Sequence, residues 1–290
     1  IVTIILLLRL HEEIQPLENS IDFYYTLWKE TAAMDHRFSG FLRRLSIILF
    51  WIVLWQTAAS LIRNHIFLVG PADTLRALCE QILLPDFWSA IAFSFWRISI
   101  GFFLAFFLGL FTGSLAYRFP IVDEFLEPPV QLMKTVPVAS FVILALIWTG
   151  SKNLSVFISF LVVYPMIHVN TKAGLISADR ELLEMAEVFH IPFIRRALYI
   201  YRTALYPYLK SACRTALGMG FKSGIAAEVI GVPDGSIGEG LYLAKIYLST
   251  AELFAWTVVI ILVSSLFEKG FLWILKKCAG KGADVNESDK

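Results

Sequence analysis

The sequence contains few side chains whose types and spacing suit covalent chemistry. The three cysteines are far apart and indicate neither a disulfide framework nor a metal cluster, and no cysteine–histidine spacing is that of a zinc site. No nucleophile–base pair and no phosphate-binding loop of the form GxxxxGK[ST] is recognisable. We therefore predict that this chain holds no catalytic site, metal site or cofactor. The residues concerned are Cys79, Cys213, Cys278, His11, His36, His65, His168 and His190.

Lys222 and Glu228 are better placed for non-covalent chemistry, because they interrupt an apolar stretch, GMGFKSGIAAE. A charge at the centre of a membrane helix costs roughly 2.5–3.5 kcal/mol on insertion scales, so it faces the bundle interior or water. One interpretation places Lys222, with Ser223 and Glu228 as further candidates, in the path of a small anion. The other pairs Lys222 with Glu228, or shifts the helix so that Lys222 lies near the membrane surface. For Glu228 we favour a structural role near the outer end of the helix over contact with a solute.

These charges stand out because the chain is otherwise strongly apolar. Of its 290 residues, 57% are hydrophobic and 17% are charged, and the mean hydropathy is +0.67. Soluble domains are closer to half apolar and a quarter charged. The composition therefore predicts a protein that crosses a membrane several times. The formal net charge of +1 gives no indication of a nucleic-acid partner.

The N-terminal segment does not fit this pattern. It begins IVTIILLLRL, with about eight apolar residues before Arg9, and a bilayer needs about 20. It also lacks the basic start of a signal peptide. The first methionine is Met34. We expect residues 1–40 to form a tail, with residues 1–33 either upstream translated sequence or poorly ordered. The alternative is a segment that lies at the membrane interface.

Six segments are candidates for membrane-spanning helices by their length and low charge. The fifth is the weakest, because three charged residues interrupt it. The runs are too long and continuous for barrel strands, so the predicted fold is an all-α membrane bundle. Gly109 and Gly113 in the second segment form a GxxxG pattern, which we expect to serve close helix packing. The segments are 45–62, 98–117 (with a helix start near residue 90), 135–151, 153–171, 210–231 and 253–275.

The distribution of Lys and Arg orients the bundle. Cytoplasmic loops of membrane proteins carry an excess of both residues. Such an excess is present before the first segment, between the second and third, between the fourth and fifth, and after the sixth. The intervening loops contain few, such as Lys152 and Lys245. We predict that both the N-terminus and the C-terminus are cytoplasmic.

The segment 176–207, between the fourth and fifth spans, is apolar and charged together. Ser177 or Asp179 can cap a helix that runs to about Phe189, and Pro192 ends it. A second short helix is expected over 193–203. The first helix carries an apolar face and, on its other faces, three acidic residues. The apolar face consists of Leu182, Met185, Ala186 and Phe189; the acidic residues are Glu181, Glu184 and Glu187.

An apolar face on a cytosolic loop has to be covered by something. Three alternatives could bury this face: the lipid interface, the protein's own bundle, or a partner protein. A helix lying on lipid would carry Lys and Arg on its polar face, whereas this helix is acidic. The acidic residues favour a partner protein with basic groups.

The segment resembles the cytoplasmic coupling loop of bacterial ABC importer permeases, the membrane subunits of binding-protein-dependent transport. The pattern of that loop is E-A-A, three residues, G, nine residues and I-x-L-P. Glu184, Ala186 and Ile200 match it. Met185 and His190 depart from it, as do the last two residues of the pattern. Because glycine adopts positive φ more easily than histidine, we expect the loop to turn later, at Pro192.

Flanking stretches extend the resemblance over about 40–275. SFWR at 94–97 and IWTG at 147–150 are similar to the second and third spans of such permeases. AEVIG at 227–231, followed by GSIG at 235–238, is similar to the stretch after their fifth span. The order and spacing of these pieces point to the nitrate, sulfonate and taurine branch.

The resemblance implies a type I importer permease: a domain over 41–277, with the coupling loop at 176–207 and a polar tail at 278–290. It implies a bacterial cytoplasmic (inner) membrane, cytosolic ATPase subunits that bind the ATP and Mg, a second permease copy and an extracytoplasmic binding protein. The solute would be a small anion such as a sulfonate, taurine, nitrate or bicarbonate. The residues implied in coupling are Glu184, Met185, Ala186, Phe189, His190, Ile191 and Ile200.

A secondary transporter or channel that works without an ATPase is the alternative. Such a protein would have no need of an apolar cytosolic loop, and it would often show inverted repeats, which we do not find. A membrane enzyme would need catalytic side chains that converge at one depth, and the sequence indicates none.

Overall fold

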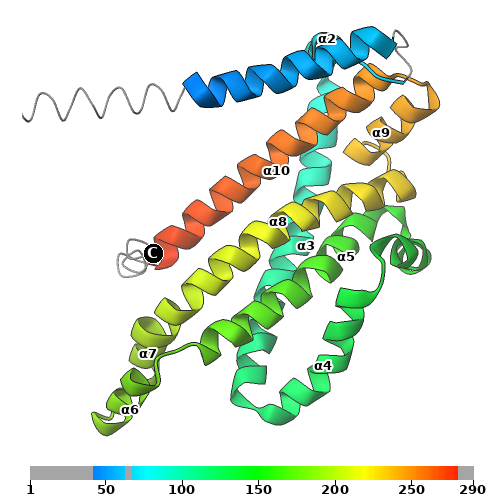
Figure 1. Ribbon diagram of the computed structural model, residues 1–290. Helices are drawn as coiled ribbons and strands as arrows, with labels where there is room; N and C mark the ends of the chain where they lie inside the picture. The colour runs from blue at the N-terminus through cyan, green and yellow to red at the C-terminus, as the bar shows by residue number, and fades with distance from the viewer. Residues whose placement is uncertain (1–41, 63–66, 280–290) are drawn as a thin grey trace, which may run out of the picture. The chain divides into compact units, whose positions relative to one another are not determined.

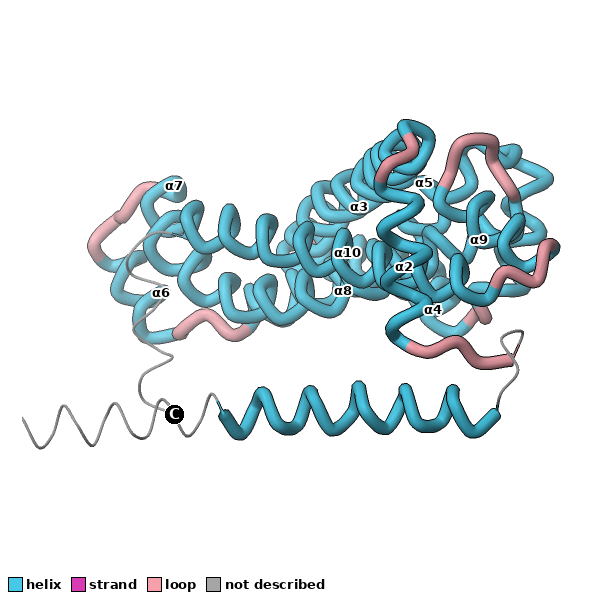
Figure 2. The backbone as a smooth tube through the Cα atoms, turned by 90° about the horizontal axis from the view of Figure 1, so that it is seen from above, coloured by secondary structure: helices cyan, strands magenta, loops and turns pink. Residues whose placement is uncertain are grey.

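The computed structural model describes residues 42–62 and 67–279. Every regular element in these ranges is helical, and short loops join the helices (Figure 2). The chain divides into two compact units, Ile1–Arg63 and Asn64–Lys290. In the first unit the described element is the helix Leu42–Ile62. The predicted tail at 1–40, the question of Met34 and residues 280–290 lie outside the described residues.

The second unit contains the remaining helices, shown in chain order in Figure 1. Proline occupies the start of α2, α3 and α4, a position where its missing N–H costs nothing. The helices are α2 (Pro71–Ile82), α3 (Pro85–Arg118), α4 (Pro120–Thr135), α5 (Val138–Ile176), α6 (Arg180–Val188), α7 (Phe193–Arg196), the π-helix η1 (Ala197–Tyr201), α8 (Arg202–Gly231), α9 (Ile237–Ile246) and α10 (Thr250–Ala279).

Four described helices are long and apolar enough to cross a membrane. They are Leu42–Ile62, Pro85–Arg118, Val138–Ile176 and Thr250–Lys277. They confirm the predicted all-α membrane fold. The weak fifth segment of the sequence corresponds to α8, which is 30 residues long and more polar than these four. The second segment begins at Pro85, about five residues before the predicted start.

The predicted third span, 135–151, is wrong in its bounds. Near its start the helix is broken: Thr135 ends α4, and Val136, which precedes Pro137, has the extended backbone that a following proline favours. At its other end Gly150 has a φ of 69° and interrupts α5. The helical part, 138–149, is therefore about 18 Å long at 1.5 Å per residue. That is shorter than a hydrocarbon core of about 30 Å.

Three helices of the second unit were not predicted. α2 and α9 are short, and α4 contains Pro128 and Pro129. An interior proline removes a hydrogen bond and usually breaks a helix, so the sequence indicates a loop there. Because α4 is amphipathic and carries acidic residues, it also lacks the apolar length that marks a span.

Close packing joins α3, α5 and α8. A Cβ atom added at Gly109 would lie 2.9 Å from Cβ of Ile167, and one at Gly113 would lie 2.8 Å from Cβ of Thr171. The backbones of α3 and α5 therefore meet where the GxxxG pattern places glycine, which confirms its predicted packing role. Ser159 of α5 lies close to both neighbours: its Cβ would be 2.9 Å from a Cβ added at Gly101 of α3, and its Oγ donates to the carbonyl oxygen of Gly220 on α8 at 2.9 Å.

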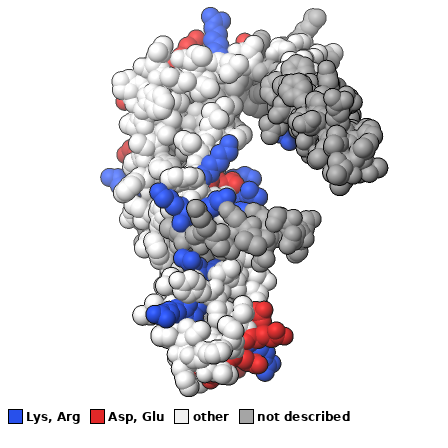
Figure 3. All heavy atoms as spheres, turned by 90° about the vertical axis from the view of Figure 1, so that its left-hand side faces the viewer, with Lys and Arg blue, Asp and Glu red and all other residues white. Residues whose placement is uncertain are grey.

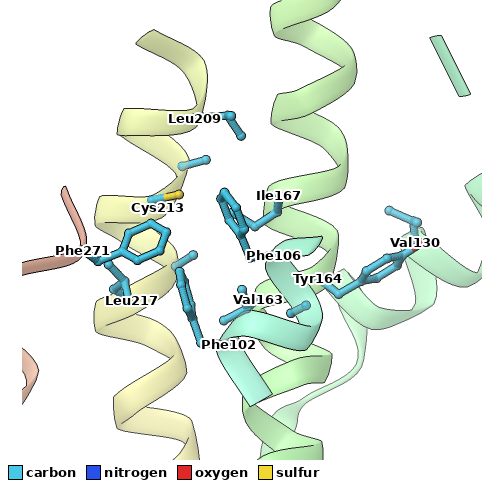
Figure 4. Packing of buried hydrophobic residues seen from close by; sticks show 13 residues of the cluster. Phe102, Phe106, Val130, Val163, Tyr164, Ile167, Leu209, Cys213, Leu217 and Phe271 are labelled. Carbon is cyan, nitrogen blue, oxygen red and sulfur yellow. The ribbon is translucent and has the colours of Figure 1, made fainter. Parts of the chain in front are cut away.

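A cluster of aromatic side chains fills the space between these helices. Phe102 and Phe106 of α3 point between α5 and α8, toward Ile167 and Cys213 (Figure 4). Phe271 of α10 completes the cluster, with its ring centroid 4.9 Å from that of Phe102 in an edge-to-face arrangement. This core holds α10 against α3 and α8.

Candidate functional site

The segment between α5 and α8 begins with a capped helix. The Asp179 side chain accepts a hydrogen bond from the backbone N–H of Glu181 at 2.9 Å, so Asp179, one of the two predicted caps, starts α6. Glu181 lies in the first turn, where a negative charge is favoured by the helix dipole. Arg180 Nε donates to Glu184 Oε1 at 3.0 Å on the exposed surface.

The chain turns at His190 and not at Pro192, which corrects the prediction. His190 has a φ of 51°. Its N–H bonds to the carbonyl of Glu187 at 3.0 Å, and the N–H of Ile191 bonds to the carbonyl of Ala186 at 2.9 Å. These two bonds form the Schellman motif that ends helices at a left-handed residue, usually glycine. The histidine therefore occupies the same backbone conformation that the family glycine would supply.

The predicted short helix at 193–203 is not a separate element. α7, η1 and α8 follow one another without a gap from Phe193 to Gly231. The π-helix η1, Ala197–Tyr201, lies where the prediction placed the end of the short helix. Single π-helical turns often occur at functional sites. The segment is therefore connected rigidly to α8 on one side and through a three-residue loop, 177–179, to α5 on the other.

The turn between α6 and α7 carries an apolar surface that nothing in the described residues covers. Phe189 is 72% exposed and Phe193 is 77% exposed. We call the exposed side chains around the turn the apolar tip: Val188, Phe189, Phe193, Ile194 and Tyr199. These exposures argue against the alternative in which the protein's own bundle buries this surface. Val188 and Ile194 are not among the predicted residues, although both are large apolar residues in a charged loop.

The other predicted coupling residues divide into exposed and buried ones. Glu184, Met185 and His190 are exposed, and Ile191 and Ile200 are partly buried. Ala186, in contrast, is 0% exposed, so it supports the turn from inside. The acidic residues of α6 are exposed. Acidic atoms gather at the lower end of the face in Figure 3, beside basic ones.

Lys222 lies on an exposed stripe of α8. The stripe repeats every three or four residues and contains polar or small side chains at four of its six positions: Ser211, Thr215, Met219, Lys222, Ala226 and Ile230. Ser223, next to the stripe, is partly buried. Polar groups on a membrane helix face protein or water, because lipid leaves them unsatisfied. If α8 lies within the membrane, the composition of this stripe suits a water-filled path or a second protein better than lipid.

Glu228 lies apart from Lys222. Six residues of helix rotate the side chain by about 120°. Glu228 is 0% exposed, and Ser94 Oγ donates to its Oε2 at 2.6 Å. In the part of the chain that the structure describes, no salt bridge joins it to Lys222, which contradicts the interpretation that paired them. The structure brings Lys222 and Ser223 together and places Glu228 elsewhere, in a buried contact. Ser94 is not predicted as the partner of Glu228, although it belongs to the SFWR stretch that resembles the second span of the permeases.

Comparison with known proteins identifies the architecture. Residues 105–275, more than half of the chain, match the family described as binding-protein-dependent transport system inner membrane component. The chain belongs to this family. The match contains α5, the apolar tip and α8 with Lys222 and Glu228, whereas Ser94 precedes it. The predicted resemblance to ABC importer permeases is confirmed.

Several permeases of this kind are similar to the chain over most of its length. A Bacillus subtilis permease protein named for aliphatic sulfonates transport, SsuC, is 25% identical over 240 residues, 82% of this chain and 86% of the relative. The Escherichia coli taurine transport system permease protein TauC is 24% identical over 226 residues, 76% and 82%. The Synechocystis bicarbonate transport system permease protein CmpB is 26% identical over 197 residues, 67% and 69%.

Family membership fixes the general role of the chain. It is an inner membrane component of binding-protein-dependent transport, with several membrane-crossing helices, and it is a transport subunit.

Proposed function

We propose that this chain is the permease subunit of an ATP-driven importer for a small anion, and that the apolar tip docks on a cytosolic ATPase. The observation that carries the proposal is the exposure of Phe189 and Phe193 on either side of the turn at His190. A cluster of exposed aromatic side chains at a tight turn has the composition of an interface hot spot. Because the acidic residues of α6 are exposed, we expect the groove on the ATPase that receives them to carry basic residues.

The remaining partners follow from this arrangement. The ATPase, and not this chain, binds ATP and Mg. A second copy of the permease faces the exposed stripe of α8, and both termini are cytoplasmic. A binding protein delivers the solute from outside. ATP-driven closure of the ATPase moves the apolar tip, and the helical connection from α7 through η1 carries that movement into α8.

The solute proposal rests on Lys222. One cation on an otherwise neutral exposed stripe of α8 attracts an anion within the low dielectric of the membrane. The names of the similar permeases suggest sulfonates, taurine and bicarbonate as candidates. We propose that Lys222 and Ser223 line the path of such an anion.

The docking proposal is tested by copurification. Phe189→Asp combined with Phe193→Asp places charge on exposed positions, so it leaves the bundle folded and should abolish recovery of the ATPase with the tagged permease. The matched control is Ile121→Asp on α4, because Ile121 is 82% exposed and lies outside the segment. If the double variant retains the ATPase as well as the control does, the tip is not the docking surface.

The path proposal is tested by uptake into proteoliposomes that hold the complete transporter. Labelled taurine, ethanesulfonate, nitrate and bicarbonate serve as probes. Lys222→Met should abolish uptake of the transported probe while the complex assembles normally, and Lys222→Arg should retain part of it. Full uptake by Lys222→Met would exclude Lys222 from the path.

A further inference from the structure

The buried contact around Glu228 joins three helices in one chain of hydrogen bonds. The backbone N–H of Ile237, at the start of α9, donates to Ser94 Oγ on α3 at 2.9 Å. Because Ser94 Oγ accepts there, its own hydrogen is directed to Oε2 of Glu228 on α8, 2.6 Å away. Successive hydrogen bonds of this kind polarise and strengthen one another. We call Ser94 and Glu228, with the N–H of Ile237, the outer pin.

The first turn of α9 lies directly on the outer pin. A Cβ atom added at Gly238 would collide with the Cβ and backbone of Glu228. Glycine is therefore required for α9 to approach α8 so closely. Ser236 caps the helix by accepting from the N–H of Glu239 at 3.0 Å. The first turn of α9 is therefore held by this cap and by the packing of Gly238 against Glu228.

The loop that leads from α8 to α9 has a strained backbone. Val232 has φ 43° and ψ 59°, a left-handed conformation that is exceptional for a β-branched residue. Its N–H donates to the carbonyl of Glu228 at 2.7 Å. Strained residues persist only where the surroundings fix them, and they cluster at active sites, ligand clamps and switch regions. Here the residue that accepts from Val232 is the same one that anchors α9.

We propose that Ser94 and Glu228 are positioning residues for transport: they hold α9 to α3 and α8 on the extracytoplasmic side, so that solute delivery there is coupled to α8. This inference rests on the proposed function, which assigns that side of the bundle to the binding protein. α9 connects α8 to α10. α8 carries Lys222, and it continues without a gap from α7 and η1, which carry Phe193, Ile194 and Tyr199 of the apolar tip. The outer pin thus links the outer surface to the helix that moves with the ATPase.

The test compares two buried serines of α3. Ser94→Ala breaks the outer pin. Ser99→Ala is the matched control, because Ser99 is also buried and its Oγ has no hydrogen-bond partner among the described residues. Each variant is reconstituted with its ATPase and binding protein, and uptake of the probe anions and ATP hydrolysis are measured together. For Ser94→Ala we expect uptake per ATP hydrolysed to fall about ten-fold, the size of effect of leaving one buried partner unsatisfied.

A purely structural contact would give a different result. Uptake and ATP hydrolysis would then fall together with the amount of assembled complex, and their ratio would match that of Ser99→Ala. That outcome overturns the proposal. A wild-type complex that neither binds an ATPase nor takes up any probe would instead overturn the proposed function, so the two failures are distinguishable.

Glu228 variants provide a second readout if Ser94→Ala does not assemble. Glu228→Gln keeps an oxygen that accepts from Ser94, whereas Glu228→Leu keeps the volume and removes the acceptor. We expect Gln to retain most of the uptake per ATP and Leu to lose it. Equal ratios in the two variants, both at the wild-type value, would contradict a positioning role.

Discussion

Tyr201 of η1 packs edge-on against Tyr117 near the C-terminal end of α3, with ring centroids 5.9 Å apart and the two hydroxyl oxygens at 3.5 Å. Edge-to-face pairs of this kind contribute about 0.5–1.5 kcal/mol beyond their buried area. The contact ties the π-helix behind the apolar tip to a helix outside the segment. If the tip moves with an ATPase as we propose, we expect the movement to reach α3 as well as α8.

Removal of the Tyr201 ring should weaken this connection. We predict that Tyr201→Ala lowers the rate of ATP-dependent uptake several-fold, while Tyr201→Phe, which keeps the ring, stays close to wild type. Uptake by the reconstituted transporter is the measurement, and recovery of the ATPase is the control for docking. Equal rates for the two variants would show that the ring contact transmits nothing.

The turn at His190 predicts the effect of substitutions there. A left-handed residue other than glycine costs roughly 1–2 kcal/mol. His190→Gly should therefore raise the thermal stability of the segment and keep ATPase docking. His190→Val, which is β-branched, should lower both. Limited proteolysis of the segment together with copurification measures the two effects, and a stabilising valine would contradict the observed backbone.

Close approach of α3 and α5 predicts a large effect at Gly113. The carbonyl oxygen of His168 would lie 2.7 Å from an added Cβ. We expect Gly113→Val to destabilise the bundle by about 1–3 kcal/mol, as overpacking does. Gly218→Ala is the contrasting variant, because no atom lies within 4 Å of its added Cβ. Alanine should stabilise that helix by about 0.5–1 kcal/mol. Thermal unfolding in detergent distinguishes them, and a similar loss in both would be inconsistent with the packing.

The ion pair between Lys172 of α5 and Asp123 of α4 predicts a charge-swap rescue. Each side chain is about one-third exposed, so the pair contributes up to about 1 kcal/mol. Asp123→Lys alone should lower stability, and adding Lys172→Asp should restore most of it. A double variant that is less stable than either single one would show that the pair does not hold α4.

The long apolar elements could be predicted from the sequence, because length and hydropathy alone indicate a span. The docking segment could be located as well, since an apolar face in a charged loop is informative without a structure. The family pattern placed Glu184 and Ile200, and the family match confirms the permease class. The predicted division into tails and one domain stays a prediction.

Other features depend on contacts that no local pattern records. α4 forms a helix in spite of Pro128 and Pro129, so tertiary packing of Val130 overrides local preference. His190 adopts the left-handed turn because two backbone hydrogen bonds fix it, although histidine disfavours that region. Glu228 pairs with Ser94, which is 134 residues away, and not with the nearby Lys222. No local sequence pattern connects two residues so far apart, so this contact could not be predicted from the sequence.

Uptake of the probe anions into proteoliposomes containing this chain, its ATPase and its binding protein tests the account most directly. Mg-ATP is enclosed on the ATPase side, and a matched preparation contains a non-hydrolysable analogue. The account predicts accumulation of one anion with ATP and none with the analogue. Uptake by the permease alone, down its gradient and without nucleotide, would contradict it and identify a stand-alone transporter or channel.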